Sequence, residues 1–246
     1  MIKSEIQFVR SLSDKRAREE SRLFIAEGDK LISEIAESKL KLRKLYITSE
    51  SGLEGIEPVE YVGDKEMERI SQLKTANCSL ALVEIPQHRI DIDRLKDKLT
   101  IVLDGVQNPG NLGTIIRLAD WFGVENIICS PNCADCYSPK VVQATMGAIL
   151  RVAIHYIDVY DTLSKLKELN VPIYGTLLEG ESIYNAPLTK EGVIVMGSEG
   201  QGVSAEVQRL FDHPLFIPPY PADNQSSESL NVAIATSIVC SEFRRR

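Results

Sequence analysis

The sequence contains few cysteines, no long hydrophobic run and fewer basic than acidic residues. No apolar stretch approaches the ~20 residues that a membrane-spanning helix needs. Residues 1–5 are not followed by the apolar core of a secretory signal peptide, so we expect a soluble cytoplasmic protein. The odd number of thinly spread cysteines indicates reduced thiols rather than a disulfide framework. They are Cys78, Cys129, Cys133, Cys136 and Cys240.

The deficit of positive charge is uneven along the chain. In total, 28 Lys and Arg residues face 35 Asp and Glu residues, and the net charge of −7 counts against the strongly basic class of nucleic-acid binders. Residues 1–45, however, contain 11 basic and 8 acidic side chains, whereas the remainder contains 17 and 27. Because contact with a nucleic acid needs only a local basic surface, the amino-terminal segment is compatible with such a partner.

The sequence gives little support to metal or histidine chemistry. Cys133 and Cys136 have the spacing of a zinc-binding pair, and Cys129 could add a third ligand. A structural zinc site usually needs four ligands, and neither a second pair nor a nearby histidine follows, so we expect no metal. No Ser-His-Asp or Cys-His arrangement is legible either.

The chain reads as two α/β regions joined by a linker. Residues 1–85 combine short apolar runs with helix-prone segments, one of them over 6–20, and predict a small α/β domain. Residues 86–97 are polar, begin with a proline and are typical of a linker. In residues 98–246, short β-branched runs alternate with helical patterns, which predicts a mostly parallel sheet with helices on both faces. These runs lie at 99–103, 126–129, 151–154, 172–176, 193–196 and 215–217.

Three polar, glycine-rich segments follow predicted strands, and ligands bind at the carboxyl ends of strands in open α/β sheets. The first segment runs from Asp104 to Arg117 and passes from a tight loop into a helix near Asn111, a residue suited to cap it. Helical spacing places Arg117 on a polar stripe with Asp120. Its guanidinium could therefore reach a phosphate near the helix start, or pair with Asp120 on the surface.

The second segment surrounds Glu199 with glycines at positions 197, 200 and 202. This spacing is neither the dinucleotide-binding fingerprint nor a phosphate-binding loop with its lysine. The glycines allow close approach of the backbone to a ligand. The alternative is an ordinary turn that exposes Glu199 to water.

The third segment contains Ile217-Pro218 and, after a polar loop, Ser229-Leu230-Asn231. An apolar helix that starts near residue 227 follows, and its composition indicates burial. Asn231 near the start of this helix needs hydrogen-bond partners. It either fastens loops together or contacts a ligand.

Together the three segments resemble the SpoU/TrmH class of the SPOUT RNA methyltransferases over residues 98–246. Asn111 and Arg117 match the Asn-Leu-Gly-x-x-x-Arg pattern of this class. Gly197 and Glu199 match its Gly-x-Glu-Gly signature, and the third segment matches its Ile-Pro and Ser-Leu-Asn elements.

Residues 1–85 resemble, less closely, the RNA-binding domain that some members of the class carry and that is similar to certain ribosomal proteins. The likeness depends on residues 22–28 and on Lys30. We expect five basic residues of this region to contact RNA, namely Lys15, Arg16, Arg18, Arg22 and Lys30.

The resemblance implies a trefoil-knotted fold that binds S-adenosylmethionine and forms a homodimer. The implied reaction is attack of a ribose 2′-hydroxyl of RNA on the methyl group of the cofactor, with ribosomal RNA a better candidate than transfer RNA. The resemblance implies catalytic roles for Arg117, Asn111, Glu199, Ser229 and Asn231. It implies cofactor contacts for Gly197, Thr176, Ile217, Pro218 and Leu230.

The identity of the proton acceptor stays open. The family assigns the base role to Arg117, but a guanidinium seldom gives up its proton, so a phosphate clamp is the easier role and Glu199 is an alternative acceptor. The segment after Ile217 departs from the family pattern, with Pro219 in place of a methionine and a longer loop at 222–228. A non-catalytic RNA-binding or ribosome-assembly protein is the rival interpretation. A dinucleotide oxidoreductase fits poorly because its fingerprint is missing.

Overall fold

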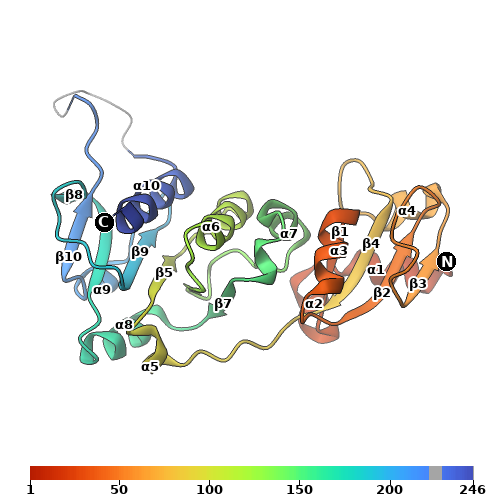
Figure 1. Cartoon of the computed structure of the whole chain (residues 1–246), viewed down its shortest axis with the longest axis horizontal. Helices are drawn as coiled ribbons and strands as arrows, with labels where there is room; N and C mark the ends of the chain where they lie inside the picture. Colours follow the sequence, from red (N-terminus) through yellow and green to blue (C-terminus); the bar gives the residue numbers. More distant parts are fainter. Residues whose placement is uncertain (222–228, 246) are drawn as a thin grey trace. The chain divides into compact units, whose positions relative to one another are not determined.

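The computed structural model describes residues 1–221 and 229–245 and divides the chain into two compact units (Figure 1). The first unit comprises Met1–Gln87 and Asp135–Leu150, and the second comprises His88–Ala134 and Arg151–Arg246. Among the described residues, no helix combines the length and the apolar character that crossing a bilayer requires.

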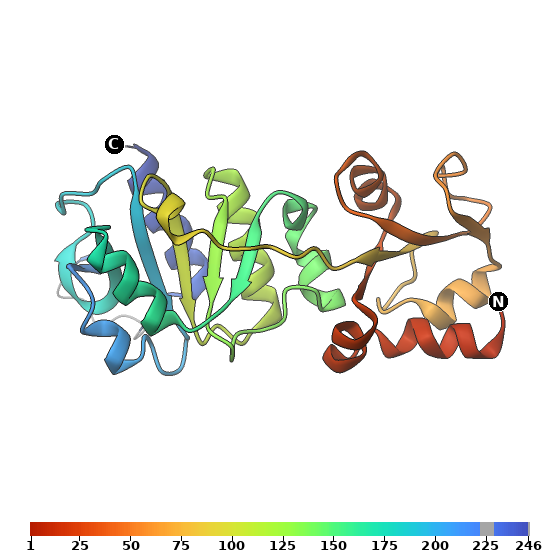
Figure 2. The same cartoon turned by 90° about the horizontal axis from the view of Figure 1, so that it is seen from below.

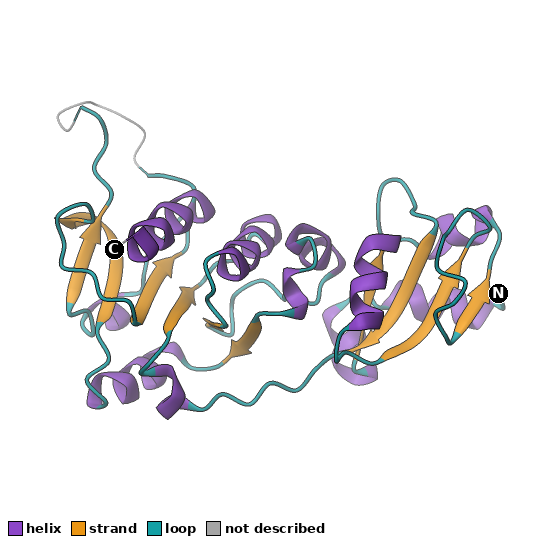
Figure 3. Cartoon of the chain, in the orientation of Figure 1, coloured by secondary structure: helices purple, strands orange, loops and turns teal. Residues whose placement is uncertain are grey.

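The first unit is a mixed four-stranded sheet with helices on both faces (Figure 3). Its elements are α1 (Lys3–Ser11), α2 (Lys15–Ser21), β1 (Leu23–Glu27), α3 (Asp29–Glu37), β2 (Leu42–Ile47), β3 (Val59–Tyr61), α4 (Asp64–Ile70), β4 (Ser79–Glu84) and α7 (Pro139–Thr145). The strand order is β1-β4-β2-β3, with β4 antiparallel to both of its neighbours and β3 parallel to β2. Helices α1 and α4 bury Val9 and Ile70 in one core with Ile25 of β1.

The helix-prone segment predicted over 6–20 forms two helices rather than one. The carboxylate of Asp14 accepts hydrogen bonds from the main-chain N–H groups of Arg16 (2.8 Å) and Ala17 (3.4 Å). This N-cap starts a new helix at α2 because it satisfies donors that the first turn leaves unpaired. Arg22, with a positive φ of 59°, ends α2 and turns the chain into β1.

Residues 135–150 pack on the first unit, although the boundaries predicted from the sequence place them in the second domain. Helix α7 in this segment contacts β1. The ring centroid of Tyr137 lies 5.1 Å from that of Phe24, and both side chains are buried. Contact between buried aromatic rings of this kind stabilises the packing.

The second unit confirms the predicted parallel sheet. Its elements are α5 (Ile92–Leu95), β5 (Leu99–Asp104), α6 (Pro109–Trp121), β6 (Asn126–Cys129), β7 (Ala153–Tyr156), α8 (Val159–Glu168), β8 (Ile173–Ser182), β9 (Gly192–Gly197), α9 (Ala205–Gln208), β10 (His213–Phe216) and α10 (Val232–Arg245). The strands lie in the order β10-β8-β9-β5-β6-β7, and every described pairing among them is parallel. Helices α6 and α10 pack together on one face, whereas α5 and α8 cover the other (Figure 2).

Two elements of the second unit differ from the sequence-based expectation. Strand β8 continues to Ser182, beyond the predicted run over 172–176, because its second half pairs with β10. The predicted linker over 86–97 contains α5, and Leu95 of this helix is buried in the core of the second unit. Tertiary packing therefore gives structure to a segment whose composition is that of a linker. The start predicted near residue 227 for the last helix lies outside the described residues.

Candidate functional site

The first two motifs meet at the carboxyl ends of two neighbouring strands. Asp104 at the end of β5 pairs with Gly197 at the end of β9. The carboxylate of Asp104 accepts a hydrogen bond from the main-chain N–H of Ser204 at 2.8 Å, which closes the glycine-rich loop over the strand end. The loops that follow parallel strands leave the sheet at the same edge, so this pairing brings the two motifs side by side.

Glycine is required at position 197 by close packing of the backbone. A Cβ atom on Gly197 would lie 2.2 Å from the carbonyl carbon of Gly202. Ser198 and Gly202 exchange two main-chain hydrogen bonds of 3.0 and 2.9 Å, so the loop folds directly back on itself. This turn places Glu199 at its tip.

Helix α6 begins earlier than the sequence indicated. Its N-cap is Asn108, whose side chain accepts hydrogen bonds from the N–H groups of Gly110 (2.8 Å) and Asn111 (3.2 Å). The expectation that Asn111 caps the helix is therefore wrong, because Asn108 followed by Pro109 makes the stronger start signal. The amide side chain of Asn111 remains available to contact other loops.

Asn111, Glu199 and Asn231 form one hydrogen-bonded network. Glu199 Oε1 accepts from Asn111 Nδ2 at 2.9 Å and from Asn231 Nδ2 at 2.6 Å. Asn231 Nδ2 also lies 3.1 Å from Asn111 Oδ1. One residue from each of the three motifs is thus joined to the other two.

Asn231 also starts the last helix. Its side-chain oxygen accepts hydrogen bonds from the N–H groups of Ala233 (3.0 Å) and Ile234 (3.3 Å). Asn231 therefore fastens the loops of the three motifs together, which is one of the two roles that the sequence suggests. A ligand contact by the same residue stays a prediction.

Arg117 lies on the exposed side of α6, two turns beyond the start of the helix. The alternative that it pairs with Asp120 is wrong, since Asp120 is held by Arg151 through contacts of 2.9 and 3.0 Å. Within residues 1–221 and 229–245, the Arg117 guanidinium has no hydrogen-bond or ion-pair partner. An exposed, unpaired guanidinium is suited to bind a phosphate.

Four of the predicted cofactor residues lie on or next to three consecutive strands of the sheet, Thr176 on β8, Gly197 on β9, and Ile217 and Pro218 after β10, whereas Leu230 lies just before α10. Gly197 ends β9, and Ile217 follows the last residue of β10. In the described part of the chain, the main-chain N–H groups of Ile217 and Leu230 have no protein acceptor. Unpaired N–H groups of this kind fit the acceptor edge of an adenine ring. The hydroxyl of Thr176, by contrast, already has a protein partner, because it donates a hydrogen bond to the carbonyl of Val195 at 3.0 Å.

Ser130 and Cys133 hydrogen-bond to the main chain at the start of the first motif, a role for which the sequence gives no signal. The Ser130 hydroxyl accepts a hydrogen bond from the Gly105 N–H at 2.8 Å. It also lies 3.4 Å from the buried thiol of Cys133. A hydrogen bond with Cys129, reinforced by Ser130, lowers the pKa of Cys133 to about 6. Among the described residues, no group of three or more His, Cys, Asp or Glu side chains could hold a metal ion.

The structure gives Arg18 a role other than the predicted contact with RNA. Only 2% of the residue is exposed. Its guanidinium donates hydrogen bonds to the carbonyls of Leu12 (2.7 Å) and Ser13 (2.9 Å) and forms an ion pair with Asp135 at 2.5 Å. Arg18 therefore connects α1, α2 and the segment that carries α7. A side chain this enclosed cannot contact a bound RNA, so the expectation for Arg18 is wrong.

The other predicted RNA-contacting residues are exposed. Lys15 and Arg16 each face an acidic residue one helical turn away, with distances of 3.8 Å to Glu19 and 2.7 Å to Glu20. Arg22 and Lys30 are exposed as well, on the chain before β1 and in the first turn of α3. Exposure leaves all of them open to contact with a nucleic acid, which stays a prediction.

Comparison with known proteins matches both units to described families. The profile of the SpoU rRNA Methylase family matches residues 98–241, and that of the MRM3-like substrate binding domain matches residues 3–81. The 23S rRNA (guanosine(2553)-2′-O)-methyltransferase RlmP of Bacillus subtilis is 26% identical over 240 residues, which cover 96% of this chain and 94% of the relative.

Two solved structures also resemble the whole chain. A TrmH-family structure from Porphyromonas gingivalis has a TM-score of 0.90 and 38% identity, with coverage of 100% of this chain and 98% of the other. The AdoMet-bound rRNA methyltransferase of Sinorhizobium meliloti has a TM-score of 0.85 and 28% identity, with coverage of 99% and 95%.

Proposed function

The chain belongs to the SpoU rRNA methylase family, and from this premise we propose that it transfers the methyl group of S-adenosylmethionine to a ribose 2′-hydroxyl of ribosomal RNA. The observation that carries the proposal is the hydrogen-bonded network that joins Asn111, Glu199 and Asn231 of the three motifs. The relative from Bacillus subtilis is a 23S rRNA 2′-O-methyltransferase, and the structure from Sinorhizobium meliloti holds AdoMet.

Arg117 acts as a clamp in this proposal. S-adenosylmethionine, when bound, supplies an activated methyl group on a sulfonium centre, so no metal is needed. The chain has to hold the ribose in line with that methyl group and accept the hydroxyl proton. A guanidinium binds phosphate through two parallel hydrogen bonds and stays protonated at neutral pH. Arg117 therefore holds the phosphate next to the target ribose and stabilises the developing oxyanion.

Glu199 is the proton acceptor in this proposal. Its Oε1 atom is occupied by the amides of Asn111 and Asn231. No side chain or main-chain group of the described residues donates to Oε2, which is left to accept the ribose hydroxyl proton. The two asparagines hold the carboxylate in place, and Ser229, two residues before Asn231, orients the ribose.

Gly197, Ile217 and Leu230 supply the main-chain contacts to the adenosine in this proposal, and Pro218 and Thr176 line the same place. The support is that Gly197 ends β9 and Ile217 follows β10, and that β8, which carries Thr176, lies between these two strands in the sheet. The trefoil knot that the resemblance implies belongs to the same proposal. Because its substrate is ribosomal RNA, we place the protein in the cytoplasm.

We propose a homodimer formed through the face of the second unit that carries α6 and α10. Trp121 at the end of α6 is 83% exposed, and Ile234 on α10 is 54% exposed. Large apolar side chains exposed on two packed helices favour association with a partner.

A methyl-transfer assay tests the proposed function. S-adenosylmethionine labelled with tritium in its methyl group is incubated with the protein and with ribosomal RNA from a strain that lacks the gene, and with transfer RNA in parallel. We expect label in ribosomal RNA, recovered as a 2′-O-methylated nucleotide. Cofactor binding by calorimetry without label in any RNA would instead support the non-catalytic RNA-binding alternative. Label in transfer RNA alone would support the transfer RNA enzyme.

A further inference from the structure

The first unit contains a pocket of about 530 Å³ at one end of its sheet. It lies where β1 and β2 begin and β4 ends, next to the chain that leads out of the unit. This volume is in the range of pockets that hold small ligands. Its lining consists of residues 21–23, 39–41, 43 and 84–87.

Four cations and one carboxylate line this pocket. Arg43 Nε lies 3.3 Å from Glu84 Oε1, and Lys41 Nζ lies 3.8 Å from Glu84 Oε2. Arg22 and Lys39 have no ion-pair or hydrogen-bond partner through their side chains among the described residues. One carboxylate cannot neutralise four cations, so the pocket carries an excess of positive charge that attracts polyanions.

Main-chain hydrogen bonds fix the two sides of the pocket relative to each other. The N–H of Glu84 donates to the carbonyl of Lys41 at 2.9 Å, and the N–H of Ile85 donates to the carbonyl of Arg22 at 2.8 Å. Strand β4 lies between β1 and β2, so Arg22 and Lys41 flank its end from opposite sides. The main chain at Arg22 and Lys41 is therefore anchored to the end of the sheet.

The exposed basic residues of α2 differ from this group because each is matched by an acid. Lys15 faces Glu19 and Arg16 faces Glu20. Between these two groups, the excess of positive charge therefore lies at the pocket and not on α2.

We propose that this pocket binds the phosphate backbone of the RNA substrate. The inference deepens the proposed function, because it assigns to the first unit a phosphate site formed by Arg22, Lys39, Lys41 and Arg43. Guanidinium and ammonium groups on an exposed, rigid edge contact phosphates without reading bases, so the site contributes affinity and orientation rather than sequence preference. Glu84 holds two of the cations in place while no RNA is bound.

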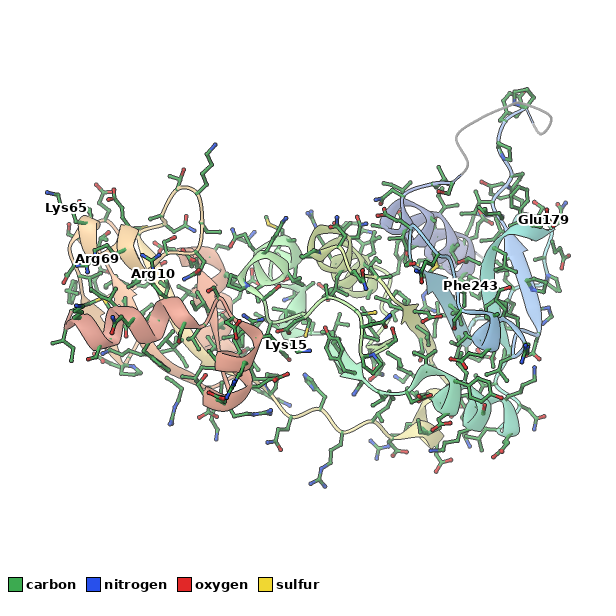
Figure 4. The ribbon with its side chains drawn as sticks, turned by 180° about the vertical axis from the view of Figure 1, so that it is seen from behind. Arg10, Lys15, Lys65, Arg69, Glu179 and Phe243 are labelled. Atoms are coloured by element: carbon green, nitrogen blue, oxygen red, sulfur yellow. The ribbon has the colours of Figure 1, made fainter. Side chains whose placement is uncertain are left out.

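A matched pair of triple variants tests the phosphate site. The test variant is Lys39→Gln/Lys41→Gln/Arg43→Gln, and the control is Lys65→Gln/Arg69→Gln/Lys74→Gln. Both remove two lysines and one arginine that are exposed in the first unit, and none of the control residues lines the pocket. Figure 4 shows Lys65 and Arg69 at the part of this unit remote from the linker. Circular dichroism melting establishes that both variants fold.

The measurement is the dissociation constant for a fluorescein-labelled RNA stem–loop, without cofactor, over a series of salt concentrations. We expect the test variant to bind about tenfold more weakly near physiological salt, with a salt slope about two units shallower, because each phosphate contact adds roughly 0.7–0.9 to that slope. The control should match the wild type within about twofold, since it removes the same charge outside the pocket. Equal losses in both variants would overturn the site, because general charge would then explain them.

Binding of ATP distinguishes a free nucleotide from RNA as the source of the phosphate. If the wild type binds ATP, the test variant loses that binding, and RNA affinity is unchanged, the pocket serves a free nucleotide and the RNA proposal is wrong. The tritium assay is scored separately. Loss of RNA affinity in the test variant together with absent methyl transfer by the wild type would leave the phosphate site standing and count against the proposed function alone.

Discussion

Arg18 in the first unit and Arg117 in the second unit show how differently the two units use the same residue type. Both arginines lie on helices preceded by capping residues. Arg18 is 2% exposed and bonded to two carbonyls and Asp135, whereas Arg117 is exposed and has no partner among the described residues. Burial, and not helical position, therefore separates a structural arginine from one available for chemistry.

The comparison extends to the acidic residues. Glu27 of the first unit is buried at the end of β1 and accepts hydrogen bonds from the Ser71 hydroxyl (2.6 Å) and the Gln72 N–H (2.8 Å). Glu199 of the second unit stands at the tip of an open loop and joins two amides from other motifs. Substitution of Arg18 or Glu27 in the first unit should therefore lower stability. Substitution of Arg117 or Glu199 in the second unit should lower methyl transfer.

Replacement of Arg117 should have the largest effect. We expect Arg117→Ala to lower methyl transfer to RNA by about 10³-fold, because it removes the group that binds phosphate and stabilises the oxyanion. Cofactor affinity, measured by calorimetry, should stay within about twofold of the wild type, since Arg117 makes no cofactor contact in the proposal. Arg209→Ala, which removes another exposed arginine from the second unit, is the control and should be fully active. Unchanged turnover of the Arg117 variant would end the assignment of this residue.

Replacement of Arg18 should give the largest loss of stability. We expect Arg18→Met to lower the free energy of unfolding by about 3–5 kcal/mol, because it leaves Asp135 and two carbonyls without their partner. Chemical denaturation followed by circular dichroism measures the loss. Arg16→Met, on the same helix but exposed, should cost less than about 0.5 kcal/mol. A loss for Arg18→Met as small as that of the control would show that the buried pair contributes little.

Replacement of Glu199 separates positioning from proton transfer. Glu199→Gln keeps an oxygen for the amides of Asn111 and Asn231 but removes the base, so we expect methyl transfer to fall about 10²-fold with little change in stability. Glu179→Gln, an exposed residue of β8 labelled in Figure 4, serves as the control. Activity of the Glu199 variant within a few-fold of the wild type would restrict this residue to holding the two amides.

Replacement of Asn231 should lower both stability and activity, because this residue caps α10 and also belongs to the network of the site. Asn231→Ala removes the N-cap of α10 and both contacts to the network, so we expect a loss of about 1 kcal/mol in unfolding free energy as well as reduced methyl transfer. Asn231→Asp keeps an oxygen that can cap α10, but it replaces the amide that donates to Glu199 with a carboxylate that repels it. It should retain stability in denaturation and lose activity, and an active Asp variant would separate the network from the chemistry.

Glu27 should produce the smallest effect, visible as a dependence of stability on pH. Burial raises the pKa of Glu27 in the folded chain, although its two hydrogen bonds act against this. The folded state therefore holds a proton that the unfolded state has released, and the stability this confers is present at acid pH and lost as pH rises through the folded pKa. Relative to Glu27→Gln, the wild type should lose stability between acid and neutral pH in urea denaturation. A constant difference across this range would show that the pKa of Glu27 is the same in the folded and unfolded chains.

Much of the second unit follows from local pattern. Runs of β-branched residues separated by helical segments specify a parallel sheet because strands buried on both faces must be continuously apolar. The sequence alone does not tell whether Asn108 or Asn111 caps α6, since both are capping residue types and only the hydrogen bonds show that Asn108 does so. The role of residues 135–150 escaped prediction because their core partners, such as Phe24, lie more than a hundred residues away.

The basic surface of the first unit shows the same limit. Counting charges in residues 1–45 located the positive excess but not the residues that carry it on the surface. Residue spacing predicts an RNA contact for the buried Arg18 but gives no signal for Lys39, Lys41 and Arg43, which line the pocket. Ion pairs and burial redistribute charge after folding, and neither can be read from spacing.

The parallel sheet, the three motifs and the family can be read from the order of residues, because periodicity and short motifs are local properties of the chain. Which polar side chains meet depends on the folded chain. It joined Asn111, Glu199 and Asn231 across separations of 88, 32 and 120 residues, left Arg117 open and enclosed Arg18. The physical reason is that hydrogen bonding and burial depend on distances in space, which parallel strands set by bringing distant loops to one edge of a sheet.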